Sequence, residues 1–326
     1  MRSISVREER WPIAGAFVIS RGAKTEARVI VTEITEGSLT GRGECTPYAR
    51  YGETIDSVLQ QLEAVRPQVE AGLDRAALQA VLAPGAARNA ADCALWDLEA
   101  KRAGRPAYAL AGLARLDPVK TAYTLSLAEP QAMAEQARAN ARRPMLKLKI
   151  GGADDLDRVQ AVREAAPRSR LIVDANEGLE FDALRRLAPE LAKLSVMLVE
   201  QPLKAGEDEA LEGYVCPVPL CADESLHTRA ELAVCARRYA CVNIKLDKAG
   251  GLTEALALTA DARAMGLQIM IGCMVATSLA MAPALILAQG AQFVDLDGPL
   301  LLAKDREPGL VYQGSMIEPP SPALWG

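Results

Sequence analysis

Short apolar runs, each ending in a charged residue, recur along the second half of this 326-residue chain. Five of these runs end at intervals of 22 to 26 residues, at Lys149, Asp174, Glu200, Asp223 and Lys245. The segments between the runs carry apolar residues at helical spacing. Buried strands that alternate with helices in this way form a parallel sheet, so we expect these five charged residues at the carboxyl ends of neighbouring strands.

The same alternation predicts a closed barrel in the second half of the chain. Eight strands are expected, at residues 120–125, 145–150, 171–174, 197–200, 220–223, 242–245, 268–272 and 293–295. Helices are expected between them, for instance at residues 155–165, 181–194, 229–238 and 253–265. Eight parallel strands with intervening helices indicate a TIM-type barrel, whose active site lies at the carboxyl ends of its strands.

The first 115 residues follow a different pattern, typical of an α+β unit. Period-2 alternation predicts antiparallel strands at residues 3–8, 16–19, 28–36 and 41–45. Helical spacing follows at residues 54–66, 75–82 and 86–103. Two polar segments, residues 20–26 and 46–53, are expected to be loops.

Composition excludes several classes of function. A net charge of -5 without a basic block argues against nucleic-acid binding. The chain has no apolar run of 18 residues and its N-terminal stretch has no apolar segment of the signal-peptide type, so we expect a cytoplasmic protein without a membrane partner. Seven scattered cysteines without a C-x-x-C pair indicate reduced thiols. His227 is the only histidine, which disfavours a zinc hydrolase.

Three of the strand-end residues are carboxylates on three consecutive predicted strands. Asp174, Glu200 and Asp223 can therefore converge on one hard divalent cation and leave room for substrate oxygens. We expect one Mg²⁺ per subunit.

The run M-L-K-L-K-I places two lysines on one face of a strand. Lys147 and Lys149 alternate with apolar residues. A solvated lysine face is the ordinary interpretation of an isolated K-x-K, but the regular recurrence of charge at strand ends favours a functional role. Lys149 and Lys245 are then expected on opposite sides of the barrel mouth, where two bases could move a proton at one carbon next to a carboxylate. Such a base needs a lowered pKa, which we expect Lys147 and the metal to provide.

Five motifs resemble the enolase superfamily, in its muconate lactonizing subgroup: K-L-K, V-D-A-N-E, V-E-Q-P, A-D-E-S and N-I-K-L-D-K-A-G-G. Further segments resemble the L-Ala-D/L-Glu epimerases along nearly the whole chain: F-V-I-S-R-G, T-G-R-G-E-C-T-P-Y-A-R-Y-G-E, A-A-R-N-A-A-D-C-A-L-W-D-L and D-L-D-G-P. The resemblance implies an α/β fold, a (β/α)7β TIM-type barrel at residues 116–299. It also implies an α+β N-terminal capping domain at residues 1–115, joined by the tail at about residues 300–326.

The resemblance also implies a reaction and a role for each site residue. The reaction is Mg-dependent epimerisation of L-Ala-D-Glu and L-Ala-L-Glu by two-base proton transfer at the glutamate α-carbon, in murein-peptide recycling. The implied acid/base pair is Lys149 and Lys245, and the implied magnesium ligands are Asp174, Glu200 and Asp223. The implied substrate-binding residues are Asp295 and Asp297 for the α-ammonium group, Arg21 for the glutamate side chain, and also Lys147, Thr124 and Cys273.

Alternatives remain open at this point. The segment from Cys273 to Ser278 carries Ala276 where some relatives have glutamate, so another dipeptide specificity is possible. An o-succinylbenzoate synthase or a cycloisomerase would use similar lysines and metal ligands, but its substrate has no ammonium group for Asp295 and Asp297. A non-catalytic barrel should have lost one of the lysines or one of the metal ligands. We expect a homo-oligomer.

Overall fold

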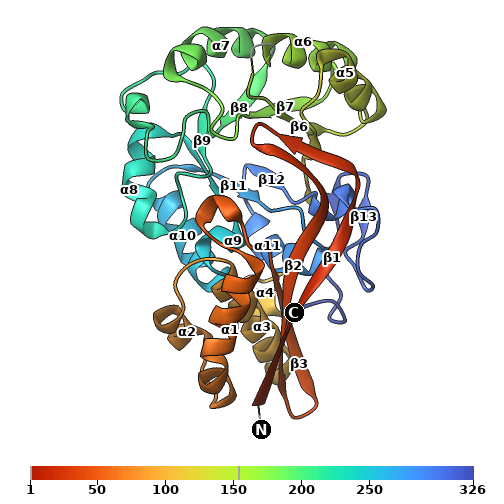
Figure 1. Ribbon diagram of the computed structural model, residues 1–326, viewed down its shortest axis with the longest axis vertical. Helices are drawn as coiled ribbons and strands as arrows, with labels where there is room; N and C mark the ends of the chain where they lie inside the picture. Colours follow the sequence, from red (N-terminus) through yellow and green to blue (C-terminus); the bar gives the residue numbers. More distant parts are fainter. Residues whose placement is uncertain (1, 153–154) are drawn as a thin grey trace.

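The computed structural model describes residues 2–152 and 155–326. A barrel with surrounding helices forms the upper part of Figure 1, and a group of orange to gold helices from the first third of the chain lies below it. The red hairpin rises along the barrel until its tip lies over the strands labelled β6, β7 and β8 (Figure 1).

Eight parallel strands form the barrel sheet, in the order β12-β11-β10-β9-β8-β7-β6-β5. Their bounds are Tyr123–Leu125 (β5), Met145–Lys149 (β6), Arg170–Asp174 (β7), Val196–Glu200 (β8), Leu220–Ala222 (β9), Cys241–Ile244 (β10), Gln268–Gly272 (β11) and Phe293–Asp295 (β12). The Ala122 N–H donates to Val294 O at 2.8 Å and so joins the two ends of the sheet. The expected barrel is therefore confirmed.

Helices cover the outside of the barrel. They are α5 (Pro130–Ala139), α6 (Asp155–Ala165), α7 (Phe181–Lys193), α8 (Arg229–Arg238), α9 (Leu246–Ala249), α10 (Leu252–Ala264) and α11 (Ser278–Ala288). A 3₁₀ turn, η2 (Glu209–Leu211), connects β8 to β9, and another, η3 (Gly298–Leu301), follows β12. The absence of a regular eighth helix in the part of the chain that the structure describes agrees with the (β/α)7β class.

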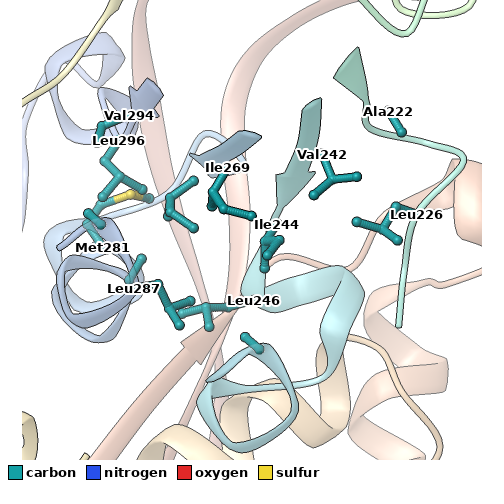
Figure 2. Close-up of a cluster of buried hydrophobic side chains, with 14 of the residues drawn as sticks. Ala222, Leu226, Val242, Ile244, Leu246, Ile269, Met281, Leu287, Val294 and Leu296 are labelled. Carbon is teal, nitrogen blue, oxygen red and sulfur yellow. The ribbon is translucent and has the colours of Figure 1, made fainter. Parts of the chain in front are cut away.

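Alternation along the strands separates two apolar layers. Outward-facing side chains pack against the helices, and Figure 2 shows part of this layer around Val242, Ile244 and Ile269. A smaller inward cluster consists of Ala122, Met145, Ile172, Leu198, Cys221, Cys241, Met270 and Phe293. For seven of these eight residues, all but Met270, the residue two positions further on is polar: Thr124, Lys147, Asp174, Glu200, Asp223, Asn243 and Asp295. Because side chains repeat with period 2, the apolar cluster forms a floor beneath a ring of polar groups.

The capping region is a three-stranded antiparallel sheet packed on helices. Its elements are β1 (Arg2–Ile19), β2 (Gly22–Glu36), β3 (Leu39–Cys45), η1 (Ala49–Tyr51), α1 (Ile55–Glu70), α2 (Arg75–Val81), α3 (Ala86–Ala103) and α4 (Ala107–Leu110). A Cβ at Gly41 would lie 2.1 Å from Ala94 O, so glycine is required where β3 meets α3.

Two predictions for the strands are wrong. Residues 20–26 are not a loop, because the turn occupies only Ser20 and Arg21 and β2 begins at Gly22. The strand predicted at residues 120–125 is two strands, and its first part, β4 (Val119–Lys120), joins a separate sheet with β13 (Tyr312–Gln313) and β14 (Met316–Ile317). None of the helices in the described ranges is long and apolar enough to cross a membrane.

The last residues of the chain pack against α3. Trp325 is 2% exposed, and its indole Nε1 donates to Cys93 O at 3.0 Å. The Gly326 N–H donates to Asp97 Oδ1 at 2.7 Å. The tail thus packs into the apolar core that α3 shares with the barrel.

We expect Trp325→Ala to lower the free energy of unfolding by about 3 kcal/mol or more, because it removes a large buried side chain and leaves a cavity. Urea unfolding followed by circular dichroism measures the effect. Val311→Ala is the matched control in the same tail, because Val311 is 57% exposed. Equal unfolding midpoints for the two variants would contradict a packing role for Trp325.

Candidate active site

The tip of the capping hairpin is docked on the carboxyl ends of the barrel strands. The Leu127 N–H donates to Val18 O at 3.0 Å, and the Ser20 hydroxyl donates to Asn176 O at 3.3 Å. Lys149 Nζ lies 5.7 Å from the centre of the Phe17 ring. The hairpin therefore covers the end of the barrel at which the polar residues gather.

Two of the predicted lysines face each other across this end. Lys149 is the last residue of β6 and Lys245 directly follows β10, and these strands are four positions apart in the eight-stranded order. Their ammonium groups are both buried. Lys149 donates to Asp174 at 2.6 Å, and Lys245 donates to Asp223 at 2.7 Å.

Lys147 lies among the predicted carboxylates. Its Nζ is 3.1 Å from Asp174, 2.7 Å from Glu200 and 2.8 Å from Asp295. A single buried ammonium group therefore links three strands of the barrel. Electrostatic attraction in this dry interior offsets the cost of burying its charge.

The three predicted magnesium ligands are buried at the ends of β7, β8 and β9. Their side chains are at most 1% exposed. Within the described residues, no three His, Cys, Asp or Glu side chains already surround a common point, and Asp174, Glu200 and Asp223 each lie against a lysine instead.

The donor set nevertheless fits a hard cation. Asn243 Nδ2 donates to Glu200 Oε1 at 2.8 Å, while Glu200 Oε2 has no hydrogen-bond partner among the described residues. That oxygen lies 2.7 Å from Lys147 Nζ without hydrogen-bond geometry. Carboxylate oxygens without a nitrogen or sulfur donor are the ligands that Mg²⁺ prefers. A cation at this place would take over the contacts that the lysines now make.

The pKa values of the neighbouring carboxylates Asp174 and Glu200 are shifted in opposite directions. Burial disfavours the charged form of Asp174, but Lys149 and Lys147 prevail and hold the pKa of Asp174 well below its usual range. Burial raises the pKa of Glu200 to about 7, and the charge of Asp174 adds to this shift. One carboxylate is thus firmly ionised, whereas its neighbour titrates near neutrality.

The carboxylates around Lys245 shift its pKa in the direction opposite to that of a nearby cation. Burial opposes its charge, but Asp223 and Glu200 prevail and hold the pKa of Lys245 above its usual value. The nearest charges are carboxylates rather than cations. A divalent cation bound by the same carboxylates would reduce this attraction.

Asp295 and Asp297 lie together at the end of β12. Asp295 Oδ2 accepts a hydrogen bond from Lys147 at 2.8 Å, and its Oδ1 has no partner within the described ranges. Asp297 Oδ2 accepts the Thr124 N–H at 2.6 Å. Burial raises the pKa of Asp297 to about 7, and Asp295 contributes further. Cys273 follows β11, whose Gly272 pairs with Asp295. The structure therefore brings Thr124, Cys273 and both aspartates together.

Arg21, in the hairpin turn, is held by groups of the protein itself. Nη2 donates to Glu224 at 2.7 Å and to the Tyr48 hydroxyl at 3.0 Å. Nη1 donates to Asn176 O at 2.6 Å and to Glu177 at 3.1 Å. These contacts fasten the hairpin to the loops after β7 and β9.

Lys248 was not singled out from the sequence, although it stands three residues after Lys245 in the same motif. It is 1% exposed, and its ammonium group donates to Asp223 Oδ1 at 2.6 Å and to Asn243 O at 2.9 Å. The half-buried His227 packs edge-on against Tyr51. A cavity of about 710 Å³ lies beside this pair; its lining includes neither Lys149 nor Lys245.

Comparisons with known proteins agree with this arrangement. The model of the mandelate racemase / muconate lactonizing enzyme N-terminal domain matches residues 1–112, and the enolase C-terminal domain-like model matches residues 131–321. The chain is 49% identical to the L-Ala-D/L-Glu epimerase of Escherichia coli K12 over 96% of this chain and 98% of that protein. It is 45% identical to the N-acetyl-D-glutamate racemase of a Pseudoalteromonas species over 91% and 95% of the two chains.

Solved structures with the same fold contain ligands. An enolase family member from Agrobacterium tumefaciens, with homology to dipeptide epimerases and with bound sodium and L-Ala-L-Glu, is 53% identical, has a TM-score of 0.98 and covers 100% of both chains. The dipeptide epimerase of Enterococcus faecalis, complexed with Mg and L-Leu-L-Tyr, is 29% identical, with a TM-score of 0.91 and 98% and 97% coverage. This chain therefore belongs to the mandelate racemase and muconate lactonizing enzyme family of the enolase superfamily, and it is an isomerase.

Proposed function

We propose that the protein is a Mg-dependent dipeptide epimerase that interconverts L-Ala-L-Glu and L-Ala-D-Glu. The observation that carries this proposal is the position of Lys149 and Lys245 on opposite sides of the barrel, with buried carboxylates between them. The relatives named epimerases, and the L-Ala-L-Glu bound to the Agrobacterium protein, support the same substrate class. A role in the recycling of murein peptides in the cytoplasm follows as part of the proposal.

The two lysines would act as acid and base in turn. The substrate α-carbon would lie between them, so that Lys149 takes the proton from one face while Lys245 returns one to the other, and the reverse for the other epimer. A Mg²⁺ held by Asp174, Glu200 and Asp223 would supply positive charge next to the substrate carboxylate and so stabilise the enolate that forms. Lys147 would add a second positive charge beside the same group.

The aspartates of β12 would hold the N-terminal end of the substrate. Asp295 Oδ1 is a buried acceptor without a partner among residues 2–152 and 155–326. A dipeptide ammonium group is a donor of the required charge. The Thr124 N–H fixes Asp297 beside it.

An assay in deuterated water tests the proposal. Purified protein with Mg²⁺ should convert L-Ala-L-Glu and L-Ala-D-Glu into each other and place deuterium at the glutamate α-carbon, as followed by NMR. Absence of conversion and of α-deuterium with both dipeptides would refute the proposed function.

A second candidate function is racemisation of an N-acylated amino acid, which the N-acetyl-D-glutamate racemase relative favours. Such a substrate carries no ammonium group for Asp295 and Asp297. The two functions therefore differ in their need for these carboxylates.

We expect Asp297→Asn to lower kcat/KM for L-Ala-L-Glu by a factor equivalent to about 2–4 kcal/mol, because it removes one charge-assisted contact in a buried site. Racemisation of N-acetyl-glutamate should change far less. Kinetics of both substrates with the wild type and the variant measure this difference. Equal losses would show that Asp297 does not bind the ammonium group.

A further inference from the structure

The segment that follows Lys245 is a single helical turn. α9 comprises only Leu246–Ala249, and Lys245 is its N-terminal capping residue. A helix of one turn has too few internal hydrogen bonds to fix its own position, so its neighbours must do so. One neighbour is the apolar layer of Figure 2, in which Leu246 lies. The other is α3 of the capping region, which packs against α9 and α10.

Three polar side chains of α3 face this segment: Arg88, Asn89 and Asp92. Their spacing of i, i+1 and i+4 places them within about 100° of one another around the helix axis. Arg88 Nη2 donates to Ala249 O at 2.7 Å and so binds a carbonyl group at the end of α9. Asp92 Oδ2 accepts the Thr253 N–H at 2.9 Å, at the start of α10. A helix of the capping region therefore holds the chain on both sides of the turn between α9 and α10.

Two glycines allow α3 to approach this turn closely. A Cβ at Gly250 would lie 2.5 Å from Arg88 Nε, and a Cβ at Gly251 would lie 2.5 Å from Asp92 Oδ2. Both glycines have a positive φ, of 78° and 108°, which other residues rarely adopt. The path of the chain after Lys245 is thus fitted to the side chains of α3.

Asp247 makes the contact with the capping region that lies nearest to the base. It stands two residues after Lys245 and is 7% exposed. Its Oδ1 accepts Asn89 Nδ2 at 2.8 Å and the Thr46 N–H at 2.9 Å. Burial raises the pKa of Asp247 to about 7. A neutral side chain with an oxygen in the same place could therefore accept the same two hydrogen bonds.

We propose that Asn89 and Asp247 are positioning residues for Lys245, so that the capping region sets the position of one of the two bases. This inference rests on the proposed function, because it takes Lys245 to exchange a proton with the substrate. A displacement of Asp247 would move the adjoining backbone of Lys245 and shift its Nζ relative to the substrate α-carbon. A shift of about 1 Å can lower a rate by about 100-fold. Lys149 stands four strands away in the barrel sheet, so its proton transfer should persist.

Hydrogen exchange with deuterated water separates the two bases. The epimer whose exchange is lost in Lys245→Ala is the one that Lys245 deprotonates, and NMR of both epimers identifies it. We expect Asp247→Ala to lower exchange of that epimer by roughly 10-fold to 100-fold and to change exchange of the other by less than about threefold. Asp247→Asn should restore exchange to within about threefold of the wild type, because its amide oxygen can accept both hydrogen bonds.

A double-mutant cycle tests whether the two side chains act together. Asn89→Ala should cause the same epimer-selective loss, and the double variant Asn89→Ala/Asp247→Ala should lose no more than the larger single loss. Leu62→Ala is the structural control, because Leu62 is buried in the separate apolar core of the capping region. It should leave the ratio of the two exchange rates unchanged. Thermal unfolding shows which variants are folded; if Asp247→Ala is not, Asn89→Ala and Asp247→Asn decide the question.

Equal losses for both epimers in Asn89→Ala or Asp247→Ala would overturn the inference, as would additive losses in the double variant. Failure of the proposed function has a different signature. If the wild type acts on N-acetyl-glutamate but on no dipeptide, the proposed function fails, while exchange of the two N-acetyl-glutamate enantiomers still decides the role of Asp247. If Lys245→Ala exchanges both epimers like the wild type, Lys245 is not a base and both proposals fail.

Discussion

Lys149→Ala and Lys245→Ala are each expected to reduce epimerisation by roughly 10²-fold to 10⁴-fold or more. Each lysine comes from its own side of the barrel, on strands four positions apart. Loss of one base therefore interrupts proton transfer in both directions. Conversion of L-Ala-L-Glu and L-Ala-D-Glu, followed by polarimetry, measures this effect.

The two variants should differ in the exchange that survives. With one base left, the enzyme should still exchange the α-hydrogen of one epimer with deuterated water, and the complementary variant should exchange only that of the other. NMR of both epimers with both variants gives four rates, with Lys304→Ala as the control. Comparable exchange of both epimers by one variant would require a single-base mechanism and contradict the assignment.

The barrel could be predicted because its strands are buried on both sides. Apolar runs located the eight strands to within a few residues, and the charged residues that end five of these runs placed Lys149, Asp174 and Glu200 at strand ends. The parallel arrangement then requires these ends to meet at one face. The charged residues that the sequence pattern places at strand ends are therefore also neighbours in the folded barrel.

The hairpin could not be predicted in the same way. The first five residues of β2, from Gly22 to Glu26, are all exposed, so they carry no apolar alternation that would identify a strand. They pair with the end of β1 across the hairpin turn and extend the sheet beyond its packed part. The sequence therefore indicates a loop where the structure has a ribbon.

Contacts between distant segments account for the remaining differences in the site. Arg21 lies about 200 residues from its partner Glu224, and no local pattern reports that pair. Lys248 is buried because α9 turns it back toward Asp223, which only the packed barrel determines. The residue types in the sequence indicate which chemistry is possible. The ion pairs in the folded protein decide which charged side chains remain available to a substrate.

Removal of divalent cations with a chelator is expected to lower turnover by roughly 10³-fold or more while the fold persists. Activity is lost because the enolate would no longer be stabilised by a strong positive charge. The fold persists because Asp174 and Asp223 have lysine partners at 2.6 and 2.7 Å, and the apolar layers on both sides of the strands do not involve the ion.

The chelated protein should unfold at nearly the temperature of the untreated protein, and Mg²⁺ should restore turnover along a saturation curve. Glu200→Gln should shift that curve to higher Mg²⁺ concentration, because it removes one anionic ligand but keeps the Asn243 contact geometry. Asp182→Asn, at an exposed helix position, should leave the curve unchanged. Full activity of the metal-free protein would exclude the metal site. A large drop in the unfolding temperature on chelation would show that the lysine ion pairs cannot replace the cation, because the buried carboxylates would then depend on it for neutralisation.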